Sequence, residues 1–136
     1  MHKSVDNWGP LILIIKEAEN GYLFGAFISQ GLNFDQEIYR KDKSAFIFSL
    51  TKGTVHYQRN KNLPVVLHSK DYISLGYRFP EFNNWDDISL KNSCHSDYWS
   101  YSDFGWAFIP PEGMEPRSPQ AQKYLAGSYR WRCEDI

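Results

Sequence analysis

Cys94 and His95 are adjacent in this chain, and Asp97 follows two positions later. A thiol, an imidazole and a carboxylate are the parts of a nucleophile, a base and an orienting group. Neighbours in sequence rarely point at one another, and such sets normally converge from separate elements. Cys94 is therefore a candidate for redox chemistry, which needs an exposed thiol with a lowered pKa. The alternative, which we expect, is a packed and unreactive cysteine.

Carboxylates near expected turns and strand ends supply a second candidate set: Glu17, Glu19, Asp86, Asp87, Asp97 and Asp103. Paired carboxylates can perform acid–base chemistry or hold a cation. Asp86 and Asp87 would point to opposite faces of a strand and could not chelate together. We expect a solvated strand entry here, with Asp86 as a turn acceptor. The histidines His2, His56 and His68 do not form a zinc spacing with Cys94. We expect no metal and no cofactor.

The densest aromatic stretch lies in the second half of the chain, within and just after Trp85–Asp103. Phe104 and Trp106 are expected in the core. For the tyrosines and tryptophan of the polar loop, a buried position and an exposed anchor for a partner both stay open. We expect the loop surface to bind a partner, with charged side chains guiding the register. The predicted binding residues are Trp85, Lys91, Asp97, Tyr98, Trp99 and Tyr101.

The composition limits the function classes. The 136 residues carry a formal charge of −1, and the 15 Lys and Arg residues are scattered, so we expect no nucleic-acid partner. The longest apolar run, Leu11–Ile15, is too short to span a bilayer or form a signal-peptide core. Without a secretory signal, Cys94 and Cys133 are expected to be reduced thiols. The sequence thus predicts a cytoplasmic protein without membrane insertion.

Short β-strands are the elements that must position these residues. Leu11–Lys16 is an apolar run that favours a strand buried on both faces. Asn20 and Gly21 are a strong hairpin signal and lead into Tyr22–Ile28. Gly25 in that strand indicates a bulge or a close approach of another backbone. A second hairpin is predicted from Ala45–Leu50 and Thr54–Gln58.

Further strands and one helix complete the predicted elements. Pro64 indicates that Val65–His68 is an edge strand. Ser118 and Pro119 predict the start of a short helix over Gln120–Leu125. The other predicted strands are Tyr72–Gly76, Asp87–Leu90, Phe104–Ile109 and Ser128–Cys133. Together these elements favour a mainly β fold with an α+β margin. We expect a two-layer antiparallel β-sandwich with one or two short peripheral helices, as a single domain over residues 1–136.

Four segments, in their order along the chain, resemble the TLDc domain of oxidation-resistance proteins. They are GPLILIIK (Gly9–Lys16), GYLFGAF (Gly21–Phe27), AFIFSL (Ala45–Leu50) and YLAGSYRW (Tyr124–Trp131). The resemblance implies a β-sandwich and a role in resistance to oxidative stress. It also implies binding to the vacuolar-type proton ATPase and control of its assembly. We therefore expect a non-enzymatic interaction domain, cytoplasmic and placed at organelle membranes through its partner.

The chain departs from the family pattern at its N-terminal end. Family members usually carry an additional N-terminal part, including a helix and a segment that packs against the first hairpin, and this sequence begins just before Gly9. A missing helix would leave an exposed apolar face or an open edge strand. Either the domain is minimal or another chain supplies the surface, and a second copy in a homodimer is one such chain.

Two functions of other classes stay open. One is a direct antioxidant or redox sensor that uses Cys94, and exposure of Cys94 would favour it. The other is a carbohydrate-binding sandwich that uses the aromatic loop, and an open aromatic platform beside polar groups would favour it. A flat loop surface without a pocket would favour the interaction domain.

Overall fold

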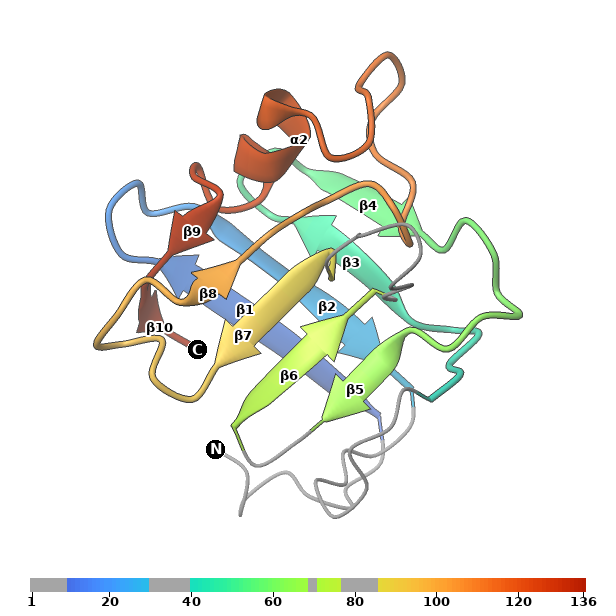
Figure 1. The fold of residues 1–136 in the computed structure, drawn as a ribbon, viewed down its shortest axis with the longest axis horizontal. Coiled ribbons are helices and arrows are strands. Elements are labelled where there is room, and N and C mark those ends of the chain that lie inside the picture. Colours follow the sequence, from blue (N-terminus) through green and yellow to red (C-terminus); the bar gives the residue numbers. More distant parts are fainter. Residues whose placement is uncertain (1–9, 30–39, 69–70, 77–85) are drawn as a thin grey trace.

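The computed structural model describes residues 10–29, 40–68, 71–76 and 86–136. Two five-stranded antiparallel sheets lie face to face (Figure 1), which confirms the predicted two-layer β-sandwich. Sheet I has the order β10-β1-β2-β3-β4 and sheet II has the order β5-β6-β7-β8-β9. The strands of sheet I are β1 (Leu11–Glu17), β2 (Leu23–Ile28), β3 (Phe46–Ser49), β4 (Thr54–Tyr57) and β10 (Cys133–Asp135). Those of sheet II are β5 (Val66–His68), β6 (Tyr72–Leu75), β7 (Ile88–Lys91), β8 (Ser100–Tyr101) and β9 (Arg130–Trp131).

Both predicted hairpins of sheet I are present. Asn20 and Gly21 turn β1 into β2, and a turn that ends at Gly53 joins β3 to β4. Gly21 and Gly53 have φ of 71° and 70°, in the left-handed region that glycine adopts without a steric penalty. Gly25 pairs in regular register with Ile14, so no bulge forms there. A Cβ at Gly25 would lie 1.8 Å from the Leu13 carbonyl oxygen, which confirms the close approach of another backbone.

Strand β1 is buried on one face only, and the prediction of burial on both faces is wrong. Leu13 and Ile15 are 5% and 0% exposed, whereas Ile12 and Ile14 are 63% and 44% exposed. Successive side chains of a strand point to opposite faces. Sheet II covers the inner face of β1, which carries Leu13 and Ile15. Among the described residues, no second layer buries Ile12 and Ile14 on the outer face.

The C-terminal part differs from the prediction in two places. Ser128–Cys133 is not one strand, because β9 belongs to sheet II and β10 belongs to sheet I, so the chain crosses between the sheets at Arg132. Phe104–Ile109 is not a strand either, and within it only Phe108 makes an isolated bridge, to Gln58. Strand β5 does lie at a sheet edge, as Pro64 indicated.

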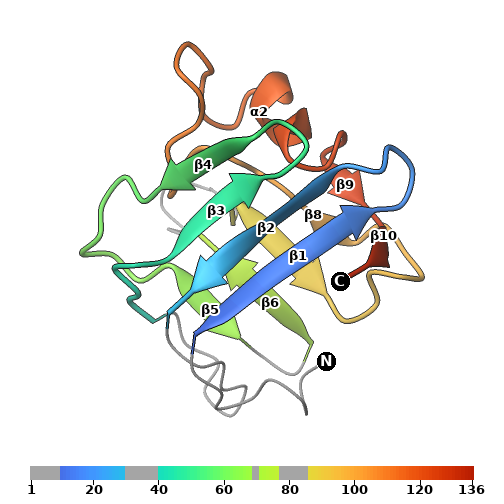
Figure 2. The same ribbon diagram turned by 180° about the vertical axis from the view of Figure 1, so that it is seen from behind.

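One short helix is present among the described residues, α2 (Pro119–Tyr124). The Ser118 side chain accepts a hydrogen bond from the Ala121 amide and caps the helix, and Pro119 occupies its first turn, as predicted. Figure 2 shows the helix at one end of the sandwich, beside β4 and β9. In the part of the chain that the structure describes, no helix is long and apolar enough to cross a membrane.

The core lies between the two sheets. Phe24 from β2 and Trp131 from β9 meet edge to face with ring centroids 5.0 Å apart, and both are fully buried. Phe104 is fully buried, as predicted, and Trp106 packs against the core while partly exposed. Aromatic pairs of this kind add about 0.5–1.5 kcal/mol beyond the area that they bury. Large aromatic side chains therefore fix how the two sheets sit on one another.

Candidate functional site

Tyr98 and Trp99 are exposed on the turn between β7 and β8, which we call the Trp99 loop (residues 92–99). Their exposed fractions are 44% and 63%. The Asp97 carboxylate accepts a hydrogen bond from the Trp99 amide at 3.1 Å, and the Tyr98 hydroxyl donates to Glu19. The Arg130 guanidinium carbon lies 5.2 Å from the centroid of the Trp99 ring. Contacts from β9 and from the first hairpin thus hold an exposed aromatic pair in place.

The other predicted binding residues are placed differently. Tyr101 is only 5% exposed, and its hydroxyl donates to the Asp86 carboxylate at 3.2 Å. The Lys91 ammonium lies 4.4 Å from the Tyr72 ring centroid and 5.8 Å from that of Tyr101. Trp85 lies outside the described residues. The structure therefore places Asp97, Tyr98 and Trp99 together on the Trp99 loop, whereas Tyr101 is buried.

Cys94 and Cys133 form a disulfide, and the expectation of two reduced thiols is wrong in this structure. Both are 1% exposed. The pairing joins residues 39 positions apart, because β10 returns to the edge of sheet I beside the turn that follows β7. Cys133 is buried in the core, as expected from its alternation with Tyr129 and Trp131. Cys94 does not meet the condition of exposure that the antioxidant alternative requires.

A cluster that the sequence analysis missed surrounds this disulfide. The sulfur atoms of Cys94 and Cys133 and a ring nitrogen of His95 all lie within 4.8 Å of one another, and His95 is exposed. The sequence shows that Cys94 and His95 are neighbours. It does not show that Cys133 lies beside them, because only the pairing of β10 with β1 brings Cys133 to this place.

Asp87 is fully buried, and the prediction of a solvated strand entry is wrong for both Asp86 and Asp87, which are 2% and 0% exposed. The Asp87 carboxylate accepts hydrogen bonds from the amides of Gly105, Ala107 and Phe108 at 3.0–3.1 Å. Burial raises the pKa of Asp87 to about 7, although these three amides lower it. The residue folds a long loop onto the start of β7, and this contact gives the carboxylate a structural role.

The remaining carboxylates also hold turns or helix ends. Glu17 accepts from two amides of the first hairpin, at 2.8 Å and 2.6 Å. Asp103 binds the Arg117 guanidinium at 2.6 Å and the Gln122 amide at 3.0 Å. Among the described residues, the carboxylates of the candidate set therefore do not converge on one site.

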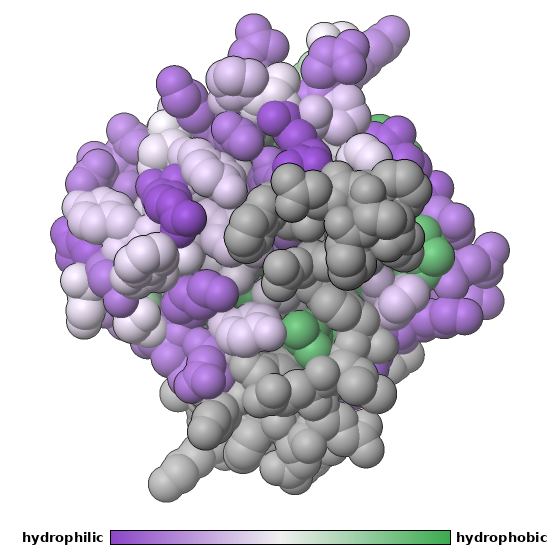
Figure 3. All heavy atoms as spheres, viewed as in Figure 1, coloured by the Kyte–Doolittle hydropathy of each residue, from purple (hydrophilic) through white to green (hydrophobic). Residues whose placement is uncertain are grey.

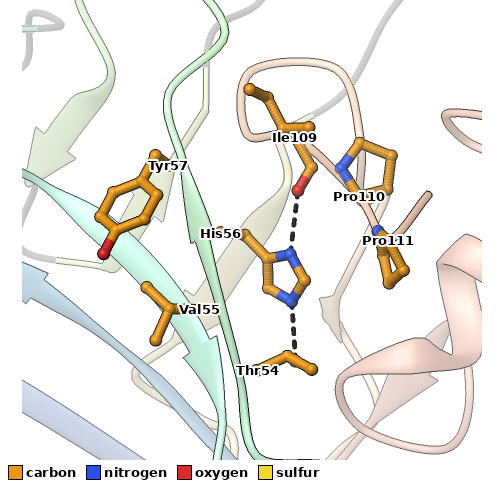
Figure 4. A pocket seen from close by; sticks show the side chains of 7 residues that line it. All are labelled: Thr54, Val55, His56, Tyr57, Ile109, Pro110 and Pro111. Atoms are coloured by element: carbon orange, nitrogen blue, oxygen red, sulfur yellow. Dashed lines mark hydrogen bonds between the residues drawn. The ribbon is translucent and has the colours of Figure 1, made fainter.

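His56 lines a surface pocket of about 380 Å³ at the edge of sheet I (Figure 4). Its Nδ1 lies 2.9 Å from the Ile109 carbonyl oxygen, so Nδ1 carries the proton and donates. Its Nε2 lies 2.9 Å from the Thr54 hydroxyl, which also contacts the Tyr124 hydroxyl at 2.8 Å. Burial lowers the pKa of His56 more than the bond to Ile109 raises it. Both ring nitrogens thus have structural partners, and the lowered pKa favours the neutral form of the ring.

The outer side of sheet I is apolar, and we call it the apolar face. Sheet I faces the viewer in Figure 2. The apolar face contains a groove of about 340 Å³, and none of the described residues that line the groove carries a charge. The opposite side of the molecule, over sheet II, is mostly hydrophilic where it is described (Figure 3). An exposed apolar face is one of the two alternatives, beside an open edge strand, that the sequence predicts for a domain without the N-terminal helix of the family, and its position on sheet I follows only from the structure. Its residues are Ile12, Ile14, Phe27, Phe46, Phe48, Leu50, Val55 and Tyr57.

Comparison with known proteins supplies one family. Residues 1–118 match the family model described as the TLDc domain. No curated protein matches the chain. The matched residues include β1 to β8 and the Trp99 loop.

Proposed function

The chain belongs to the TLDc domain family, and from this premise we propose that it is a non-enzymatic protein-interaction domain. The observation that carries the proposal is the exposed Trp99 indole, which lies against the Arg130 guanidinium and whose backbone amide donates to the Asp97 carboxylate. Exposed aromatic side chains that are already ordered lose little entropy on binding and are frequent hot spots of interfaces. The buried polar groups described above support the same conclusion, because each is engaged in holding the fold.

The partner that we propose is the vacuolar-type proton ATPase, and we attribute oxidative-stress resistance to this binding. The resemblance to the family is the ground for the partner. The surroundings of Trp99 define the chemistry that a partner must offer. Arg130 lies against the indole, and Arg132 lies nearby, where it donates to the His95 carbonyl oxygen at 3.2 Å. A complementary surface therefore has an apolar pocket for the indole and an acidic rim.

Affinity capture from cell extract tests this proposal. The bait is the wild-type chain, a Trp99→Ala variant or a Tyr57→Ala variant. Tyr57 is a matched control because it is a 58% exposed aromatic on the apolar face, at the other side of the molecule. Recovery of proton-ATPase subunits by wild type and Tyr57→Ala, with a loss of at least about tenfold for Trp99→Ala, is the expected result.

The other outcomes of the capture are also informative. Loss by Tyr57→Ala alone would move the binding surface to the apolar face. Failure of the wild-type chain to recover any ATPase subunit would overturn the partner. A hit on a glycan array that depends on Trp99 would instead favour the carbohydrate-binding alternative, since an exposed indole can also stack on a sugar ring.

A second observation favours self-association. The groove on the apolar face has an uncharged lining, so a second copy can meet the same face without like-charge repulsion. A two-fold contact places the same residues on both sides, and an apolar patch of this kind usually marks an interface. We propose that two copies pair through this face, with the Lys16–Glu134 ion pair (3.2 Å) at its rim.

Sedimentation velocity tests the pairing. Val55 is 48% exposed and lines the groove, so Val55→Lys would place a charge in the apolar contact on both copies. We expect a concentration-dependent dimer for the wild type and a monomer for Val55→Lys. Tyr98→Lys, at a 44% exposed site on the Trp99 loop, is the matched control and should remain dimeric. A monomeric wild type would overturn the pairing.

A further inference from the structure

We propose that Cys94, Cys133 and His95 form a binding site for a soft divalent metal, zinc above all, when the disulfide is reduced. The observation is the cluster itself: two sulfur atoms and one imidazole nitrogen lie within 4.8 Å of one another. Thiolate and imidazole are the ligands that zinc prefers in proteins. The site goes beyond the proposed interaction function and does not depend on it.

The three ligand atoms lie close enough for one tetrahedral zinc to bind them once the sulfur–sulfur bond is broken. With zinc–sulfur and zinc–nitrogen bonds of about 2.3 Å and 2.0 Å, two thiolates lie about 3.8 Å apart and a thiolate and an imidazole about 3.5 Å apart. A bonded pair of sulfurs is too close for one tetrahedral zinc to bind both in this way. The disulfide and the metal site are therefore alternative states of the same residues. His95 is exposed, so the metal can reach the site from solvent.

Backbone hydrogen bonds hold the ligands near one another without the disulfide. The Cys133 amide donates to the Cys94 carbonyl oxygen at 2.8 Å, and the Cys94 amide donates to the Lys91 carbonyl oxygen at 3.1 Å. The Arg132 guanidinium holds the His95 carbonyl oxygen at 3.2 Å. Because these bonds do not involve the sulfur atoms, they still connect the two segments when the sulfur–sulfur bond is broken. A site whose ligands are already positioned loses little entropy on binding the metal.

The chemistry balances in two steps. An external dithiol gives two electrons and two protons to the Cys94–Cys133 disulfide and is itself oxidised to a disulfide. Zinc then replaces the thiol protons of Cys94 and Cys133, which leave to solvent. Two thiolates and one divalent cation are neutral together, which suits a pair of cysteines that is 1% exposed. In the reverse direction an external disulfide takes two electrons from the two thiolates and two protons from solvent and is itself reduced to a dithiol, so that the Cys94–Cys133 bond forms again and zinc leaves as the divalent cation.

Cobalt titration of the full chain tests the site. The protein is reduced with a phosphine, freed of reductant without air, and titrated with cobalt chloride. We expect thiolate-to-cobalt charge-transfer bands and the visible bands of tetrahedral cobalt, saturating at about one metal per chain, which zinc then displaces. Zinc binding should release about two protons per metal. The oxidised wild-type chain is the matched control and should show none of these signals.

His95→Gln distinguishes this site from two cysteines that bind metal loosely. The variant keeps both cysteines and changes only an exposed side chain. We expect the reduced variant to bind cobalt at least about tenfold more weakly than the reduced wild type. Equal affinity would overturn the role of His95, and absence of thiolate bands in reduced wild type would overturn the site. Should the reduced chain unfold, zinc must restore its β-sheet circular dichroism spectrum, and failure to do so would also overturn the proposal.

Discussion

Cys94 and Cys133 connect the two sheets of the sandwich at the point where the chain crosses between them. Cys133 begins β10 of sheet I directly after the crossing, and Cys94 lies on the turn that follows β7 of sheet II. The Cys133 amide also donates to the Cys94 carbonyl oxygen at 2.8 Å. A disulfide and a hydrogen bond thus connect the same two residues and tie the Trp99 loop, which contains Cys94, to the start of β10.

Removal of the disulfide should lower stability. A disulfide that closes a loop of this length, with 39 residues of separation, contributes about 4 kcal/mol in the chain-entropy view. We expect Cys133→Ala, compared with the oxidised wild type in urea unfolding, to shift the midpoint down correspondingly. Cys94→Ala should have the same effect, and the double variant should add little to either single change. Fully additive losses would show that the cysteines act separately.

Asp87→Ala should destabilise the domain more than a typical surface change. The substitution leaves three buried amides, of Gly105, Ala107 and Phe108, without their acceptor. Each unsatisfied amide costs about 1–3 kcal/mol, so we expect a loss of at least about 3 kcal/mol in the free energy of unfolding. Asp97→Ala is the control at a less buried carboxylate that accepts one amide, and it should cost about 1 kcal/mol or less. Equal effects of the two changes would contradict the structural role of Asp87.

The pH dependence of stability should report Asp87. Its pKa is raised from 3.8 to about 7 in the folded chain, so the folded state holds this proton more tightly than the unfolded state. Its contribution is therefore fully present below about pH 4 and is lost as the pH rises through about 7. We expect the wild type to lose stability relative to Asp87→Asn across this window, measured by urea unfolding at each pH. His56 has the opposite effect, because its lowered pKa makes the free energy of unfolding decrease as the pH falls. Both proteins contain His56, so its effect cancels in the difference between them. A constant difference between the two proteins would refute the assignment.

Gly25→Ala should prevent correct folding. The new Cβ would lie 1.8 Å from the Leu13 carbonyl oxygen and 3.0 Å from the Phe48 ring, and backbone in the middle of a sheet cannot move away. We expect an insoluble or unfolded chain by circular dichroism. Gly53→Ala is the control, because nothing lies within 4 Å of its Cβ and only its φ of 70° is unfavourable. That change should cost about 1 kcal/mol and leave the fold intact. A folded Gly25→Ala protein would contradict the register of β1 and β2.

Local signals in the sequence were sufficient for most of the elements. Asn20 and Gly21 form a turn through their own backbone preferences, and Ser118 caps α2 through a bond to an amide three residues away. Tyr98 and Trp99 are predicted as binding residues because they belong to the densest aromatic stretch of the chain and lie in a polar loop. Each of these features depends on residues that are close in sequence.

Two predictions that depended on apolar content alone were wrong: the burial of β1 on both faces and a strand over Phe104–Ile109. A run such as Leu11–Lys16 is compatible with burial on one face or on two, and only the position of sheet II decides between them. Within Phe104–Ile109, the amides of Gly105, Ala107 and Phe108 donate to the Asp87 carboxylate, so they cannot enter a strand ladder. A buried acceptor from a distant element thus overrode the local preference.

The sequence by itself determined the β-rich elements, the two hairpins of sheet I and the membership of the TLDc family. Only the tertiary structure decided which groups meet: Cys94 with Cys133 beside His95, Asp87 with the loop that covers β7, and Arg130 with Trp99. The physical reason is the range of the interactions. Turns and caps arise from bonds within a few residues, whereas these contacts join segments that are far apart in sequence and become neighbours only when the two sheets pack.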